Sequence, residues 1–353
     1  MDYFIIILKI VILEYLIIIA HELIHIITAL LMKLKPTYIY IIPFVIYFDK
    51  SKFNIKFKPL KEDPVTSRTH FKAVTISSKL NYTILLKKLR FYNYVGPLFD
   101  FIIFIILFPF GLINIQYSYL ALLALIHLTI SSINFFNSDG KFAIGSKEDT
   151  RCAFDLVRNF TICGNGVVPE VSKRILTDIH MEISENIEIE EFDVNDLWNF
   201  LNNISFFTNS LLSYLNGDIF KIHNKSFDFF NRLIIDFDKI KLYDYRQEEK
   251  TSIAILYYLI YKKIYDDTFD IINFKIPKLK FFNPYYKELY NLFFNNSNNL
   301  SFLNNNNNLP SYASYCHGYN KLLKNLLTYY VNWRCYHTTN KWIIIKKNSL
   351  WSF

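Results

Sequence analysis

Cysteine is scarce in this chain of 353 residues, which holds only Cys152, Cys163, Cys316 and Cys335. Their wide spacing excludes the disulfide framework of a small secreted domain. No RNA- or DNA-binding motif accompanies the net charge of +8, so nucleic acid is not an expected partner. A basic leader is also lacking: the first apolar run is too long for a signal peptide and opens with Asp2, so we expect no cleavable signal peptide.

Apolar residues, in contrast, make up 52% of the chain and aromatic residues 18%, both high for a soluble protein. They gather in three runs, residues 3–34, 94–113 and 119–136. The first is longer than the roughly 20 residues that a bilayer requires, and the other two are near that length. Lysine and arginine flank these runs on the side that the positive-inside rule assigns to the cytoplasm. We therefore expect a multi-pass protein of a bacterial cell membrane, with the lipid bilayer as a partner and the N-terminus outside.

The segments between and after these runs have other patterns. Residues 38–58 alternate as two short strands joined at 49–52, and Pro43 favours an edge position for the first strand. Beyond residue 145, apolar residues recur at helical spacing until an Asn-rich loop at 295–308. The predicted fold is mainly α: a membrane-embedded core (1–145) with about three transmembrane helices and a small β-hairpin, then an α-helical cytoplasmic domain (146–353).

The first apolar run contains the motif His-Glu-Leu-Ile-His at residues 21–25. Helical spacing of four places His21 and His25 on one face, where both imidazoles can bind one zinc ion, while Glu22 can act as a base on water. Ionisable groups are costly in hydrocarbon and usually mark function there. Asp139, at the cytoplasmic end of the third run, has a similar expected depth and suits a third ligand; the alternatives are a tolerated polar cluster and, for Asp139, a plain turn residue.

These residues resemble the site-2-protease family of intramembrane zinc metalloproteases over roughly the first 150 residues. Residues 21–25 are similar to its zinc helix, residues 94–100 (Tyr-Val-Gly-Pro-Leu-Phe-Asp) to its Gly-Pro segment, and residues 134–140 to its Asn…Asp-Gly segment. The chain departs from the family in two places. An aspartate stands at 100, where the family usually has asparagine, and the linker before Asp139-Gly140 is short and lacks prolines.

The resemblance implies a ligand set and a set of roles. Zinc is held by His21, His25 and Asp139, and Glu22 is the general base. The implied oxyanion or substrate contacts are Asn134, Asp100 and Gly96.

The leading hypothesis is an intramembrane zinc metalloendopeptidase that cleaves a membrane-associated peptide or protein, whose unwound segment adds to the strands at 38–58. Two alternatives stay open. One is a membrane-anchored metalloprotease with its site at the surface, and the other is a non-catalytic membrane binding or immunity factor that retains a metal site.

Other polar residues give weaker signals. Glu14 shares the stripe of the two histidines, but it lies too far along the helix to share their metal; it either faces a water-filled cavity or pairs with Lys9. His127, in the third run, is more typical of a buried histidine bonded to a neighbour than of a substrate or proton site. A second metal site at Cys316-His317 and Cys335-x-His337 is permitted by the spacing but not favoured.

Overall fold

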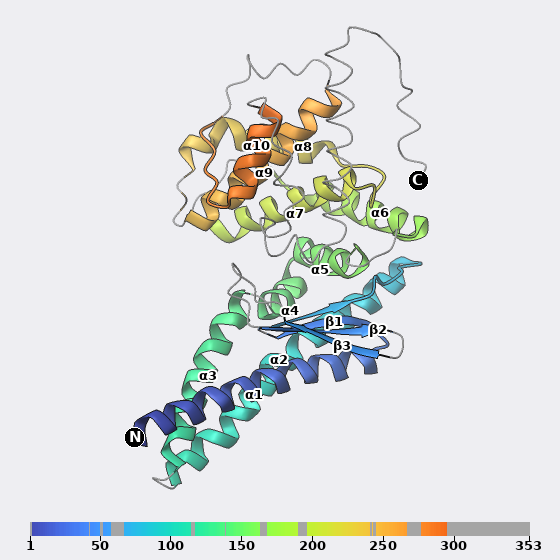
Figure 1. Ribbon diagram of the computed structural model, residues 1–353. Coiled ribbons are helices and arrows are strands. Elements are labelled where there is room, and N and C mark those ends of the chain that lie inside the picture. Colours follow the sequence, from blue (N-terminus) through green and yellow to red (C-terminus); the bar gives the residue numbers. More distant parts are fainter. Residues whose placement is uncertain are drawn as a thin grey trace. The chain divides into compact units, whose positions relative to one another are not determined.

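The computed structural model forms two compact units, residues 1–166 and 167–353, which are described separately. It describes the following residues: 2–41, 43–49, 52–57, 67–113, 117–137, 139–162, 168–189, 196–240, 242, 245–266 and 277–294. The described part is mainly helical, with one small sheet (Figure 1). The first unit runs to residue 166 and includes the helix Thr150–Ile162, which packs on other helices of this unit.

The described residues of the first unit form nine elements in chain order. They are α1 (Asp2–Leu31), β1 (Pro36–Ile41), β2 (Phe44–Asp49), β3 (Lys52–Phe57), β4 (Ser67–Phe71), α2 (Lys79–Ile113), α3 (Ser118–Asn137), α4 (Asp139–Glu148) and α5 (Thr150–Ile162). The helices α1, α2 and α3 pack on one another, and the sheet lies along the second half of α1 (Figure 1). Polar residues from all three helices therefore meet inside the unit.

The end of α1 is fixed by its own backbone. Lys33 takes the left-handed conformation (φ 62°), so the Leu34 amide donates to Ala29 at 2.8 Å and the Lys33 amide donates to Leu30 at 2.9 Å. This pair of bonds is a Schellman motif, which satisfies carbonyls that the helix end would leave open. Pro36 then starts β1 and prevents the helix from continuing.

Two helices, Tyr3–Leu31 and Lys79–Ile113, are long and apolar enough to cross a membrane by length and composition. A core helix of a soluble protein would be mostly buried, but only 6% of the first apolar window and 17% of the second are buried here. Most side chains in these two windows are therefore not buried within the described structure. The apolar part of α3, Ser118–Ser132, is shorter.

The helix α2 starts at Lys79, well before the run predicted at 94–113. Leu85, Leu86, Leu89 and Tyr92 are buried on one face of this extension, which explains why a polar, basic segment is helical. Gly96 therefore lies in the middle of the helix instead of opening it.

The sheet is larger than the predicted hairpin. It is antiparallel with the order β3-β2-β1-β4, and the strand expected to be continuous across Pro43 is instead two strands folded back on each other. Pro43 occupies the turn between them, where its missing N–H costs no ladder bond. The strands β1 and β2 are thus interior, and among the described strands β3 and β4 form the edges.

An aromatic cluster packs α5 against the rest of the first unit. Phe160 of α5 stacks on Phe71 of β4 at 5.2 Å between ring centroids and meets Tyr92 of α2 edge-on at 6.1 Å. The Val74 amide also donates to the Phe160 carbonyl at 3.0 Å. Tyr92 lies 4.7 Å from the His25 ring, so this cluster closes one side of the histidine pair.

The described part of the second unit is helical. It comprises α6 (Glu170–Asn186), α7 (Leu197–Leu215), α8 (Asn224–Asp236), the short 3-10 helix η2 (Phe237–Lys239), α9 (Tyr245–Tyr265) and α10 (Pro284–Phe294). Aromatic side chains such as Phe207, Phe229 and Phe230 are fully buried between α7, α8 and α9. The helical spacing in the sequence thus predicted this unit's class.

Candidate metal centre

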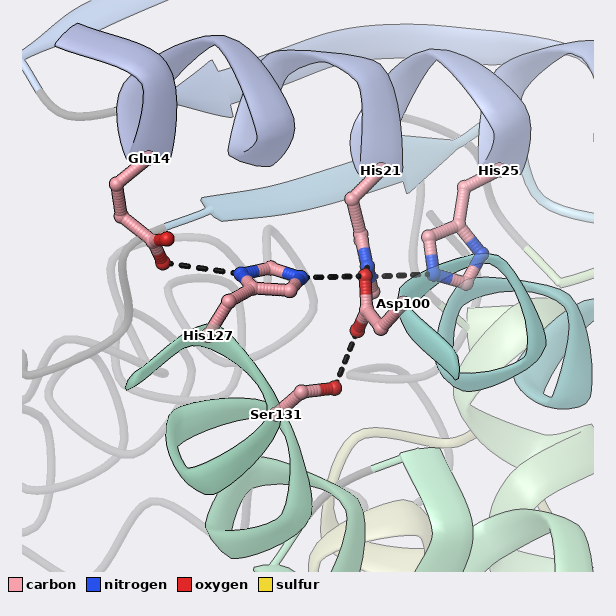
Figure 2. A network of polar contacts seen from close by, with 6 residues as sticks. All are labelled: Glu14, His21, His25, Asp100, His127 and Ser131. Carbon is pink, nitrogen blue, oxygen red and sulfur yellow. Dashed lines mark hydrogen bonds and ion pairs between the residues drawn. The ribbon is translucent and has the colours of Figure 1, made fainter. Parts of the chain in front are cut away.

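The helix α1 brings the two histidines of the motif together one turn apart. His21 Nε2 and His25 Nε2 lie 3.1 Å from each other (Figure 2). His25 is only 3% exposed and Glu22 only 5%, so the motif is buried inside the first unit. Two ring nitrogens this close either share one proton or hold one ion between them.

A glycine of α2 leaves space beside this nitrogen pair. A Cβ atom built on Gly96 would lie 2.3 Å from His25 Nε2 and 2.6 Å from His21 Nε2. That point is close to both nitrogens at once, and any side chain at position 96 would fill it. The absence of a side chain keeps open the space that an ion held by both imidazoles requires.

Asp100, one turn further along α2, orients His21. Its Oδ1 lies 2.8 Å from His21 Nδ1, and the Ser131 hydroxyl of α3 donates to its Oδ2. An ionised carboxylate only accepts hydrogen bonds, so the proton of His21 is on Nδ1 and its Nε2 presents a lone pair toward His25. Asp100 is 3% exposed and its oxygens are occupied, so it supports the histidine rather than a substrate.

His127 of α3 extends the network. Its Nδ1 lies 3.0 Å from Glu14 Oε1, and its Nε2 lies 3.1 Å from Asp100 Oδ1. It is therefore a buried histidine bonded to its neighbours, the interpretation that the sequence favoured. Glu14 contacts His127, whereas Lys9 lies over the Tyr119 ring at 5.6 Å.

Glu22 points toward the sheet. The Thr69 hydroxyl of β4 donates to Glu22 Oε2 at 2.6 Å. A strand at the edge of the sheet therefore fixes the carboxylate of the motif, and the outer edge of β4 carries no further strand among the described residues.

The histidine pair fits zinc. Tetrahedral coordination at about 2.0–2.1 Å places two ligand nitrogens about 3.3 Å apart, close to the 3.1 Å found here. The carboxylate on the outer nitrogen of His21 is the usual support of a metal-binding histidine. Among the described side chains no third histidine, cysteine or carboxylate completes a metal site. Asp139 begins α4 and Asn134 belongs to α3, but the side chains of both lie outside the described residues.

A cavity of about 230 Å³ lies between α1, α2 and α3. Its lining is apolar: Leu13, Leu16, Ile17, Ala20, Phe99, Ile103, Leu107, Leu120 and Leu123. None of the network residues lines it, so it offers no polar group that would orient a reacting peptide.

The second unit has its own buried polar cluster around His180, which is fully buried. The His223 amide donates to its Nε2 at 3.3 Å, and Ser210 Oγ lies 3.1 Å from its Nδ1. Burial, with a smaller contribution from the neighbouring His223 side chain, lowers the pKa of His180 from 6.5 to about 3. A neutral ring with both nitrogens engaged is a structural element of the helix packing.

The sequence indicated the motif, Gly96 and Asp100, but not Thr69 or Ser131. Isolated hydroxyl residues occur throughout the chain, and only the approach of β4 and α3 to the motif distinguishes these two. The candidate second site at Cys316, His317, Cys335 and His337 lies outside the described residues. Models of known protein families, curated proteins and solved structures include no match to this chain, so its function has to be inferred from the site itself.

Proposed function

We propose that this protein is an intramembrane zinc metalloendopeptidase, similar to the site-2-protease family, that cleaves a membrane-associated peptide or protein. The observation that carries the proposal is the nitrogen pair of His21 and His25, 3.1 Å apart beside the open space at Gly96. The carboxylate of Asp100 on the outer nitrogen of His21 supports it further.

Zinc would be held by His21 and His25, with Asp139 as the third ligand. When bound, it would supply Lewis-acid polarisation of the scissile carbonyl and activation of water. Asn134 remains the proposed contact of the oxyanion. Asp100 takes the role of orienting His21, because its own oxygens are already occupied.

Glu22 would act as the general base. It takes a proton from the attacking water, whose oxygen bonds to the scissile carbonyl carbon, and passes that proton to the leaving amine as the C–N bond breaks. The hydroxyl of Thr69 holds one carboxylate oxygen, which keeps the side chain in one rotamer. The other oxygen is left for proton transfer.

The edge strand β4 suggests how a substrate reaches the site. A substrate helix hides its carbonyls in its own hydrogen bonds, so a segment must unwind before hydrolysis. The unwound segment would pair with the outer edge of β4, the strand whose Thr69 contacts Glu22. The expected strands at 38–58 are mostly interior, so β4 replaces them in this role.

We place the protein in a bacterial cell membrane as a multi-pass protein, with α3 as a third span beside the two candidate helices. The N-terminus would lie outside, and the helical second half would lie in the cytoplasm and recruit or gate the substrate. The basic residues that flank the spans support this orientation.

The first test is the zinc content of the full-length, detergent-solubilised protein beside His21→Ala and Asp139→Ala. About one zinc per chain, lost in both variants, is the expected result. If zinc is lost only in the His21 variant, the third ligand is not Asp139, and a site at the membrane surface is favoured. No zinc in a folded, metal-supplied protein would refute the proposal.

Glu22→Gln separates an enzyme from a binding or immunity factor. The amide cannot act as a base but can still accept from Thr69, so zinc should stay bound. Biological activity should disappear if the protein is a peptidase and persist if it only binds. A Glu22→Gln variant with full zinc content and full biological activity would favour the non-catalytic binding factor over the peptidase.

A further inference from the structure

Glu14, His127, Asp100 and His21 form one continuous line of polar contacts across three helices (Figure 2). The line leaves α1 at Glu14, passes through α3 and α2, and returns to α1 at His21. The distances along it are 3.0, 3.1 and 2.8 Å. The proposed hydrolysis gives Glu14 and His127 no role.

We propose that Glu14 and His127 are positioning residues, which act through Asp100 to fix the ring of His21 and thereby the metal site. This inference rests on the proposed function for its biological meaning. The contacts that carry it do not depend on hydrolysis.

The first step is the orientation of the Asp100 carboxylate. The terminal torsion of aspartate is soft, so the donors around the carboxylate decide its plane. His127 and His21 share Oδ1, and Ser131 donates to Oδ2. Without His127, one of the two contacts that fix Oδ1 disappears and the carboxylate can turn away from His21.

The second step is the orientation of His127 itself. His127 Nδ1 forms a hydrogen bond with Glu14 Oε1 at 3.0 Å, and its Nε2 lies within ion-pair distance of Asp100 Oδ1, 3.1 Å away. Glu14 thus holds the ring on the side away from the metal site. Buried ionisable groups within apolar helices are tolerated when they are paired in this way.

The third step links the carboxylate to the metal. Asp100 keeps the proton of His21 on Nδ1, so Nε2 offers its lone pair toward His25 Nε2, 3.1 Å away. Loss of such a supporting contact typically weakens metal binding about 10- to 100-fold. His127→Ala should therefore weaken zinc binding without removing any ligand.

The variants are chosen to separate positioning from packing. In His127→Ala both contacts are lost, whereas the Gln side chain of His127→Gln can still donate to Asp100 from the position of Nε2. Thr129→Ala is the matched control, because Thr129 lies on α3 two residues from Ser131 and its hydroxyl only bonds back to the Leu125 carbonyl. Glu14→Gln keeps an oxygen acceptor for His127.

The experiment uses the full-length protein in detergent. Zinc affinity is measured by competition with a chromophoric chelator, and the ligand geometry by the visible spectrum of the Co²⁺-loaded protein. His127→Ala should bind zinc about 10- to 100-fold more weakly, with an altered Co²⁺ spectrum. The single variants His127→Gln and Glu14→Gln should retain most of the wild-type zinc affinity. Thr129→Ala should have the zinc affinity and the Co²⁺ spectrum of the wild type. A folded His127→Ala with wild-type affinity and spectrum would overturn the proposal.

A measurement on the metal-free protein distinguishes failure of the positioning role from failure of the proposed peptidase function. In the ¹⁵N-histidine-labelled protein without metal, the ring nitrogen shifts should show His21 protonated on Nδ1, and His127→Ala should give a mixture of tautomers. A wild type that binds no metal but shows this dependence would refute the peptidase and support the positioning role. An unchanged His21 tautomer in His127→Ala would refute the positioning role even if the wild type binds zinc.

Discussion

Gly96→Ala should abolish metal binding while leaving the fold intact. The added Cβ would lie 2.3 Å from His25 Nε2 and 2.6 Å from His21 Nε2, whereas ordinary contact begins at 3.4 Å. At least one ring must therefore move by about 1 Å, which exceeds the tolerance of about 0.2 Å in a metal–ligand distance. The atoms in conflict belong to the two imidazole side chains and not to the backbone, so the rings are the groups that must move.

The size of the effect follows from that displacement. Overpacking of a buried site lowers the free energy of unfolding by about 1–3 kcal/mol, and replacing glycine by alanine inside a helix raises it by about 0.5–1 kcal/mol. The net loss of stability should thus lie between about 0 and 2.5 kcal/mol. Zinc affinity should fall by more than about 100-fold, because a ligand itself is displaced and not merely its support.

Gly145→Ala is the matched control. Gly145 is also a helical, buried glycine, but its added Cβ would meet only Cys152 Sγ at 3.6 Å, an ordinary contact. This variant should bind zinc normally and be slightly stabilised. The assay is zinc affinity by chelator competition, together with thermal unfolding. Wild-type zinc affinity in a folded Gly96→Ala protein would show that the nitrogen pair is not the metal site.

Three further predictions concern other residues. Glu22→Gln should retain zinc and lower hydrolysis of a trapped substrate by about 10²- to 10⁴-fold, as measured by product formation; equal turnover would exclude Glu22 as the base. Thr69→Val removes the donor to Glu22, so turnover should fall about 10-fold with zinc unchanged, and a matching loss of zinc would point to misfolding instead. His180 titrates near pH 3 when folded but near 6.5 when unfolded, so the unfolded state takes up its proton first as pH falls. The stability of the second unit should be full above pH 6.5 and decline by up to about 1.4 kcal/mol per pH unit below it. Trp198 lies on α7 of this unit and no tryptophan precedes it in the sequence, so denaturant unfolding followed by tryptophan fluorescence reports on the second unit. The His180→Gln variant should lack this pH dependence of stability.

The sequence predicted the class of the fold because helical periodicity and long apolar runs are local properties. It did not predict the turn at Pro43, because residues 38–48 read as one continuous β-rich run and only pairing of β1 with β4 and β2 makes two strands. The start of α2 was missed for a related reason. The apolar face at 85–92 is short, and its helical character depends on burial against other elements.

For the site, the sequence identified the residues that a motif fixes by spacing. His21, Glu22 and His25 lie on one helix, so their proximity follows from its geometry alone. The partners of Glu14 could not be predicted in the same way. Lys9 is near in sequence, but His127 comes from a helix more than a hundred residues away, and only helix packing decides between them.

The two kinds of contact also differ in the elements that they require. The histidine pair exists as soon as α1 is helical, since both members lie on it. The orientation of that pair requires Asp100 from α2, and the orientation of Asp100 requires His127 and Ser131 from α3. Each later contact buries a charged group that is stable only when its partner is present. Packing of the three helices is therefore coupled to the geometry of the proposed metal site, so a variant that loosens α3 should weaken metal binding even where no proposed ligand is changed.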